Sequence, residues 1–195
     1  MIPFEATLRA ICRDLVEASL QFAIVGGLAV SARTEPRFTR DADLAVAVGN
    51  DPEAEDLIRT LRGRGYVVDS LLEQTVASRI ATVRLRHGVA SLVPVIDLLF
   101  ASSGIEHEVI AAAESIELLP ALHVPVATIG HLIALKVLSR DDEERPQDLI
   151  DLRMLRRVAS PDDLTQAKRA VGMIVSRGYN RGRDLEEALR RLGLC

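Results

Sequence analysis

The sequence has few cysteines, few lysines and no long apolar run. Two cysteines among 195 residues, Cys12 and Cys195, cannot form a disulfide framework, and so low a count is typical of a reducing compartment. Charged side chains interrupt the first twenty residues, which argues against a secretion signal. No stretch reaches the roughly 18 apolar residues that a membrane span requires. These absences predict a cytoplasmic protein that makes no membrane contact.

A large excess of positive charge is also absent. The 24 Lys and Arg residues are outnumbered by 28 Asp and Glu residues, which excludes a uniformly basic coat for nucleic acid. The charge is uneven, because residues 136–195 hold 13 basic and 11 acidic side chains, against 11 and 17 in residues 1–135. The mildly basic second section therefore leaves local contact with a polyanion open.

The spacing of apolar residues predicts an α+β fold, since short apolar runs favour strands and stripes at helical spacing favour helices. The expected strands are 22–25, 44–48, about 80–86 and 91–100, with a hairpin turn at 87–90. The expected helices are 3–20, 28–32, 52–64, 105–114, 128–140, 146–158, 161–177 and 184–192. We therefore expect a mixed β-sheet core with flanking helices in residues 1–104. A mainly helical C-terminal section, residues 105–195, forms a bundle that completes the cleft.

Two aspartates stand two residues apart at the mouth of the second expected strand. Asp41 and Asp43 share one face of that strand, because side chains at i and i+2 point the same way. Carboxylates held together repel each other and raise each other's pKa unless a cation lies between them. The pair indicates either a metal site or a solvated loop at the start of a strand.

Asp97 lies inside the most apolar strand of the expected sheet. Burying an unpaired carboxylate is costly, so Asp97 should bind a metal, pair with an arginine or lie at an exposed strand end. Together with Asp41 and Asp43 it would form an all-oxygen site, which suits Mg²⁺ bound with substrate phosphates. We therefore expect these three aspartates to be the metal ligands.

A diglycine, Gly26-Gly27, follows the first expected strand and precedes a helix. Glycines at such a turn permit positive φ and let a phosphate approach the backbone, where the N–H groups of the helix start face the anion. A plain tight corner would have the same sequence. The combination of Gly-Gly, Asp-x-Asp and a later strand aspartate is more specific than any of its parts.

These motifs together resemble a known family. Ile24-Val25-Gly26-Gly27 and the tract from Thr39 to Leu44 are similar to the signature of the polymerase-β-like nucleotidyltransferases, and most similar to AbiEii-like toxins of type IV. The resemblance covers roughly residues 20–155 and includes Leu132–Lys136 and Arg145–Leu152. It implies a nucleotidyltransferase core in which Gly26, Gly27, Thr39 and Lys136 contact the nucleotide. The family often has Gly-Ser at the glycine motif, so Gly27 lacks a hydroxyl here.

Lys136 lies within the apolar stripe of its expected helix, between Leu132, Ile129 and Ile133. An ammonium there either reaches along the helix to solvent or enters a cleft, and we favour the cleft. The resemblance implies that it contacts nucleotide phosphate. Pro146 opens the next helix and places Asp148 in its first turn, where a carboxylate also stabilises the helix dipole.

Asp151 heads the apolar stripe of the same helix. The resemblance implies that Asp148 and Asp151 organise the nucleotide cleft or serve as a base, without deciding between them. A basic turn with Arg177, Arg181 and Arg183 either touches an acceptor or is a solvated loop, and we favour the solvated loop. Thr39 is interpreted as a residue that bonds the loop aiming Asp41.

The resulting hypothesis is a magnesium-dependent nucleotidyltransferase that moves an NMP from an NTP to RNA such as tRNA, or to protein. Two Mg²⁺ ions would bridge Asp41, Asp43 and Asp97 to the phosphates. The resemblance implies a toxin-like role with an antitoxin as partner. Two alternatives stay open: a non-catalytic nucleotide- or partner-binding protein that retains the fold, and an enzyme that modifies a small molecule such as an antibiotic.

Overall fold

The computed structural model describes residues 4–35, 39, 41–74, 78–88, 94–141, 143 and 145–194. These residues form a mixed seven-stranded sheet and eight helices. The strands are β1 (Phe22–Val25), β2 (Asp41–Val46), β3 (Tyr66–Gln74), β4 (Arg79–His87), β5 (Val95–Leu99), β6 (Glu114–Leu119) and β7 (Leu122–Val126). The helices are α1 (Phe4–Glu17), α2 (Gly26–Arg33), α3 (Asp51–Gly63), α4 (Glu106–Ala111), α5 (Ile129–Ser139), α6 (Pro146–Val158), α7 (Pro161–Ser176) and α8 (Leu185–Arg191).

The strands follow the order β3-β4-β5-β2-β1-β7-β6 across the sheet. β2 runs parallel to β5 and β1 runs parallel to β7, while the other neighbouring pairs are antiparallel. The mixed sheet with flanking helices confirms the expected α+β class. The central strands β5, β2 and β1 come from distant parts of the sequence, so the middle of the sheet brings separate motifs together.

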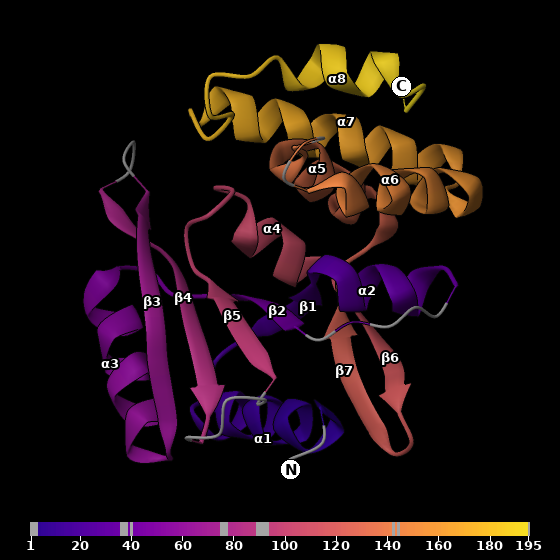
Figure 1. Ribbon diagram of the computed structural model, residues 1–195. Helices are drawn as coiled ribbons and strands as arrows, with labels where there is room; N and C mark the ends of the chain where they lie inside the picture. The colour runs from indigo at the N-terminus through magenta and orange to yellow at the C-terminus, as the bar shows by residue number, and fades with distance from the viewer. Residues whose placement is uncertain are drawn as a thin grey trace.

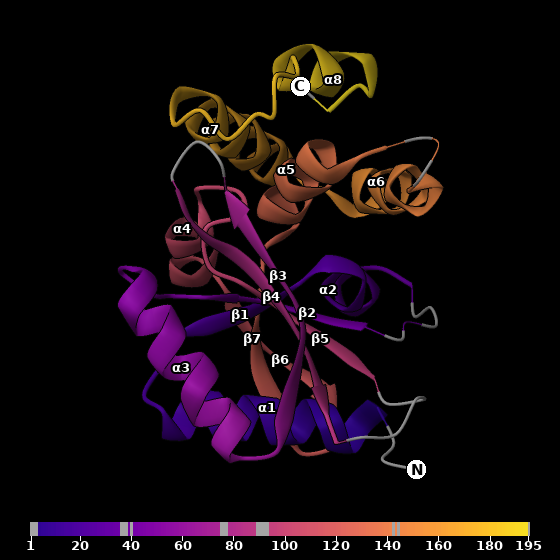
Figure 2. The same cartoon turned by 60° about the vertical axis from the view of Figure 1, so that its left-hand side comes forward.

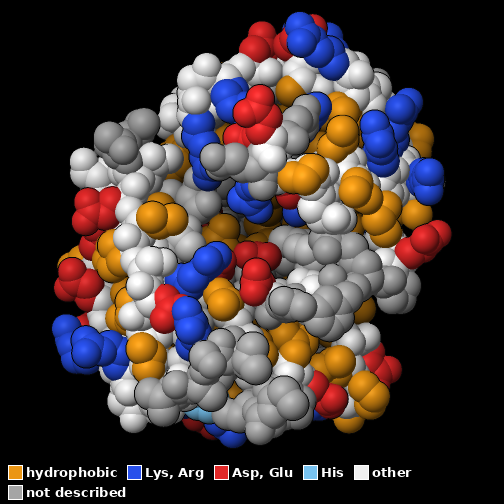
Figure 3. Space-filling model, in the orientation of Figure 1, with side chains coloured by type: hydrophobic (Ala, Val, Ile, Leu, Met, Phe, Trp, Pro, Cys, Tyr) orange, Lys and Arg blue, Asp and Glu red, His pale blue; other side chains and the backbone are white. Residues whose placement is uncertain are grey.

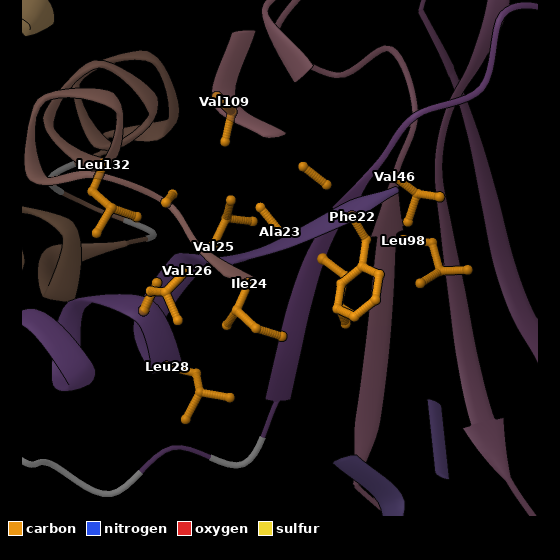
Figure 4. Packing of buried hydrophobic residues seen from close by; sticks show 14 of the residues in the cluster. Phe22, Ala23, Ile24, Val25, Leu28, Val46, Leu98, Val109, Val126 and Leu132 are labelled. Atoms are coloured by element: carbon orange, nitrogen blue, oxygen red, sulfur yellow. The ribbon is translucent and has the colours of Figure 1, made fainter. Parts of the chain in front are cut away.

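β1 lies near the centre and is buried on both faces, which explains its uninterrupted apolar sequence. Figure 4 shows Ala23 and Val25 pointing to the side of Val109, while Phe22 and Ile24 point to the opposite side. Alternate side chains of this strand therefore join the packing on both faces, and the strand fixes the position of the glycine turn that follows it.

The four C-terminal helices gather at one end of the sheet, at the top of Figures 1 and 2, while α1 lies at the opposite end. α5 is the central helix of this group, because it packs against α6, α7 and α8 and also against α2. The end of the sheet at which the glycine turn follows β1 therefore faces a wall of helices. Among the described helices, none is both long and apolar enough to span a membrane.

Three strands were missing from the sequence-based expectation. β3 was not expected, and β6 and β7 interrupt the section after residue 105 that was expected to be helical. β7 pairs with β1, because Val126 lies opposite Ile24, and its alternating burial marks a half-covered strand. The expected strand 91–100 begins at Val95, and residues 89–93 lie outside the described part. The division of the chain at residue 104 stays a prediction.

Candidate functional site

One row of residues crosses the sheet and forms the floor of a pocket. Val25, Asp43, Asp97, Arg84 and Ser70 lie opposite one another in register on β1, β2, β5, β4 and β3. All five line a cavity of about 360 Å³. The other lining residues come from the turn after β1, from neighbouring positions in the sheet and from the helical section: Gly26, Leu72, Thr82, Leu99, Ser102, Ser103, Leu132, Leu135, Lys136, Leu138, Ser139, Arg145 and Arg181. The pocket therefore lies between the sheet and the C-terminal helices.

Asp43 and Asp97 are direct neighbours on the parallel strands β2 and β5. Removal from water, followed by the negative charge of Asp97, raises the pKa of Asp43 to about 6, and Asp41 adds to the rise while Lys136 and Arg145 oppose it. The negative charge of ionised Asp43 is therefore not fully balanced by the positive charges around it. A cation placed beside it would relieve that deficit.

Asp41 is the first residue of β2 and is exposed, two residues before Asp43 on the same face. The Thr39 hydroxyl donates to the backbone carbonyl of Asp41 at 3.2 Å, as expected for a residue that bonds the loop before β2. Asp41 does not line the pocket. Arg37 and Arg40, which flank this tract in the sequence, lie outside the described residues.

Asp97 is bound by an arginine rather than left open. Arg84 of β4 donates from Nε to Oδ1 at 2.8 Å and from Nη2 to Oδ2 at 2.7 Å. Of the states considered from the sequence, arginine pairing is therefore the one found here. The carboxylates of Asp41, Asp43 and Asp97 are hard oxygen donors of the kind that Mg²⁺ prefers. No group of three acidic, histidine or cysteine side chains is arranged to hold a metal as the described residues stand.

Gly26 is the first residue of α2 and adopts a φ of 63°. A Cβ built on Gly26 would lie 1.8 Å from Oδ2 of Asp43, so only glycine fits against the carboxylate. No side chain caps the start of α2, which leaves its first N–H groups for another acceptor. Gly27, one residue further, accepts a bond from the Ser31 hydroxyl through its carbonyl and does not line the pocket.

Lys136 of α5 is buried, as its place in the apolar stripe predicts, and its side chain is 9% exposed. Its Nζ lies 2.6 Å from Oδ1 of Asp148 and 2.8 Å from Oδ2 of Asp151, both on α6. The Ser139 hydroxyl also donates to Asp148, and the Gln147 amide donates to Asp151. The two carboxylates therefore lie behind Lys136 and fix its position, while Lys136 alone of the three lines the pocket.

The helical wall carries further positive charge. Arg145 Nε lies 3.2 Å from Oδ2 of Asp148, and Arg181 reaches the carbonyl of Ser102 at 3.4 Å. Removal from water and the charges of Arg145 and Arg183 lower the pKa of Arg181, which shows that positive groups crowd there. Figure 3 shows acidic side chains at the centre of this face with basic side chains above and beside them. The pocket thus has an acidic floor and a basic wall.

Arg84 and Arg181 were not identified as site residues from the sequence, and Arg181 was interpreted as part of a solvated loop. Arg181 does lie in an exposed turn, and it also lines the pocket. The sequence around Arg84 offers only a weak signal, because an arginine that alternates with apolar residues on a strand either faces water or pairs with a carboxylate partner on the same face. Finding that partner required the strand order, which the sequence does not state.

Solved structures share this fold at low sequence identity. The antibiotic-resistance factor ANT(2'')-Ia in solution is 17% identical, with a TM-score of 0.59, and the match covers 98% of this chain and 97% of that one. The crystal structure of ANT(2'')-Ia in complex with adenylyl-2''-tobramycin is 16% identical, with a TM-score of 0.57, and the match covers 87% of this chain and 95% of that one. An antigenic nucleotidyltransferase-like protein from Paracoccidioides brasiliensis is 14% identical, with a TM-score of 0.55, and the match covers 97% of this chain and 91% of that one.

No curated protein matches the sequence. A family model does, over residues 9–193, which is nearly the whole chain. That family is described as the nucleotidyl transferase AbiEii toxin of type IV TA systems. The acidic floor, the glycine turn and the helical wall all fall within the matched residues. The chain therefore belongs to the AbiEii family of nucleotidyltransferases.

Proposed function

We propose that this nucleotidyltransferase moves an NMP from an NTP to an acceptor hydroxyl on RNA, such as tRNA, or on protein, with Mg²⁺ bound by Asp41, Asp43 and Asp97. The observation that carries the proposal is the register of β2 and β5, which sets Asp43 opposite Asp97 on the pocket floor. When bound there, two Mg²⁺ ions would lower the pKa of the acceptor hydroxyl and offset the charge that develops on pyrophosphate.

The chain's own residues supply the remaining requirements for holding a triphosphate. Gly26 lets the phosphates approach the backbone at the start of α2, where N–H groups point outward. Lys136, held by two aspartates, places a fixed positive charge on the opposite wall. Arg145 and Arg181 extend that charge along the pocket. A polyanion is thus held between the metal ligands of the floor and the cations of the wall.

The biological proposal follows from the family. A member of a toxin family of type IV systems is expected to modify a component that growth requires, with an antitoxin counteracting it. The solved ANT(2'')-Ia complex holds an adenylylated antibiotic, so a small-molecule acceptor is included as a separate arm of the test.

Transfer of label from each of the four NTPs tests the proposal. The protein is incubated with Mg²⁺ and one labelled NTP, together with total cellular RNA, total protein or an aminoglycoside. We expect label in the RNA or protein fraction and its loss in Asp43→Ala. Asp56→Ala is the matched control, because Asp56 is exposed on α3 and its carboxylate pairs with Arg59 of the same helix.

Three results would count against the proposal. Label transfer that persists in Asp43→Ala would show that the floor carboxylates are not required. Label on the aminoglycoside alone would replace the macromolecular acceptor by a small molecule. Absence of transfer together with absence of Mg²⁺-dependent NTP binding would favour a binding protein that retains the fold.

A further inference from the structure

The pairing of Asp97 with Arg84 conflicts with the use of Asp97 as a metal ligand. Both carboxylate oxygens accept a hydrogen bond from the same guanidinium, at 2.8 and 2.7 Å. This two-point arrangement is among the strongest ion pairs in proteins and satisfies the carboxylate without a metal. A divalent cation would need lone pairs of the same oxygens at about 2.0–2.6 Å.

Arg84 also faces the other two expected ligands. The negative charges of Asp41 and Asp43, after the bond to Asp97, contribute to raising the pKa of Arg84. The guanidinium is therefore the bonded counter-charge of Asp97, whereas Lys136 and Arg145 are the cations that act on Asp43. A divalent cation entering the same space would be repelled by the guanidinium.

The two partners differ in their freedom to move. The Arg84 side chain is 47% exposed and lines the pocket, whereas that of Asp97 is 12% exposed on a central strand. Arg84 can therefore swing toward the pocket while Asp97 stays in place. A polyphosphate in the pocket would offer the released guanidinium a new anionic partner.

We propose that Arg84 is a built-in competitor for the metal site, so that binding of a divalent cation at Asp97 requires release of the guanidinium. Arg84 is in this sense a positioning residue that holds Asp97 until metal and nucleotide arrive. The inference rests on the proposed function, since it assumes that Asp97 is a metal ligand.

Binding of Mn²⁺ alone, measured by calorimetry without nucleotide, tests the proposal. We expect Arg84→Gln to bind Mn²⁺ about tenfold more tightly than the wild type, because the competing cation is removed. Arg84→Lys should lie between them, since lysine keeps the charge but loses the two-point geometry. Arg86→Gln is the matched control: Arg86 lies two residues further on β4, pairs with Asp69 of β3 and is 39% exposed. Its affinity for Mn²⁺ should equal that of the wild type.

An unchanged or weaker affinity in Arg84→Gln would overturn the proposal and show that Arg84 orients Asp97 rather than competing for it. If Arg84→Gln does not fold, as judged by circular dichroism, Arg84→Lys decides, and a wild-type affinity there overturns the proposal as well. The label-transfer assay on the wild type distinguishes a failure of this proposal from a failure of the proposed function. Metal-dependent transfer with no effect of Arg84 on Mn²⁺ affinity rejects this inference alone, whereas no Mn²⁺ binding by any variant and no transfer reject both.

Discussion

Gly26 and Asp43 illustrate at the residue scale how closely the turn and the acidic floor fit together. The backbone of Gly26 is left-handed, and the space of a Cβ is taken by the carboxylate of Asp43. The glycine is therefore required for two reasons, its conformation and its lack of a side chain. Each reason alone would disfavour any other residue at this position.

Gly26→Ala is expected to lower the free energy of unfolding by about 2 kcal/mol or more and to abolish nucleotidyl transfer. The left-handed conformation costs about 1–2 kcal/mol for a residue with a Cβ, and the methyl group must also displace Asp43. Urea unfolding followed by circular dichroism measures the first effect. Gly172→Ala is the control, because α7 leaves open space there and alanine should stabilise that helix by about 0.5–1 kcal/mol. Equal stability of Gly26→Ala and the wild type would contradict the steric argument.

Asp43→Asn is expected to stabilise the metal-free protein at neutral pH and to have little effect at low pH. The folded-state pKa of about 6 exceeds the ordinary value of 3.8, so the folded protein binds this proton more tightly than the unfolded chain. Stability from this group is thus present below pH 3.8 and is lost as the pH rises through 6. Removing the charge should raise Tm by about 2–4 °C at pH 7.5. Thermal scans at pH 5 and pH 7.5 in the presence of a chelator measure the rise in Tm. A larger rise at pH 5 than at pH 7.5 would contradict the prediction.

At the scale of elements, a buried ion cluster joins α5 to α6. Lys136 comes from α5, and its partners Asp148 and Asp151 come from the first two turns of α6. The side chains of the two aspartates are 3% and 0% exposed, so the charges depend on each other rather than on water. The cluster fixes α5 and α6 relative to each other within the helical wall.

Asp151→Asn is expected to destabilise the protein by about 3 kcal/mol, because a buried lysine loses one of its two carboxylates. Urea unfolding measures the change. Asp162→Asn, an exposed acid in the first turn of α7, is the control and should change stability by less than about 0.5 kcal/mol. Equally small losses of stability in the two variants would show that the cluster does not stabilise the protein.

Elements with a local signal were predictable, and elements defined by their neighbours were not. The helix at 146–158 was predicted with its bounds, because Pro146 marks its start and the apolar stripe continues to Val158. β3 was missed because most of its side chains are exposed, so no apolar alternation shows in its sequence. β7 did carry a local signal, because Leu122, Val124 and Val126 alternate with His123 and Pro125, but that run of five residues and β6 were missed.

The same division applies to the site. The motif residues Gly26, Asp43, Asp97 and Lys136 were expected and all line one pocket. Arg84 is brought to that pocket by the pairing of β4 with β5, and Arg181 by the path of the chain after α7. Both placements depend on contacts between residues that are far apart in the sequence. Their roles, like those of Asp41, Gly27, Thr39, Asp148 and Asp151, stay predictions until variants are measured.

At the scale of the whole molecule, the pocket joins two parts of the chain that are far apart in sequence. The floor comes from residues before 100, and the wall includes Arg145 and Arg181. A ligand that contacts both should therefore stabilise the protein as a unit. Ligand binding at one hundred times Kd contributes about 2.7 kcal/mol.

Arg181→Gln is expected to raise KM for the NTP about tenfold while kcat changes by less than about threefold, because Arg181 contacts the pocket from the wall and not the floor. The increase in Tm caused by magnesium and NTP should shrink in the same variant. Steady-state kinetics and thermal scans measure both. Arg157→Gln, exposed on α6 outside the pocket, should behave as the wild type. A loss of kcat at unchanged KM would place Arg181 at the reacting atoms instead.

The late position of Arg181 has a consequence for synthesis of the protein. The pocket wall is incomplete until translation has passed residue 181. Nascent or truncated chains that already display the acidic floor would therefore lack part of the surface that seats the nucleotide. The acidic floor is thus synthesised before the wall that faces it is complete.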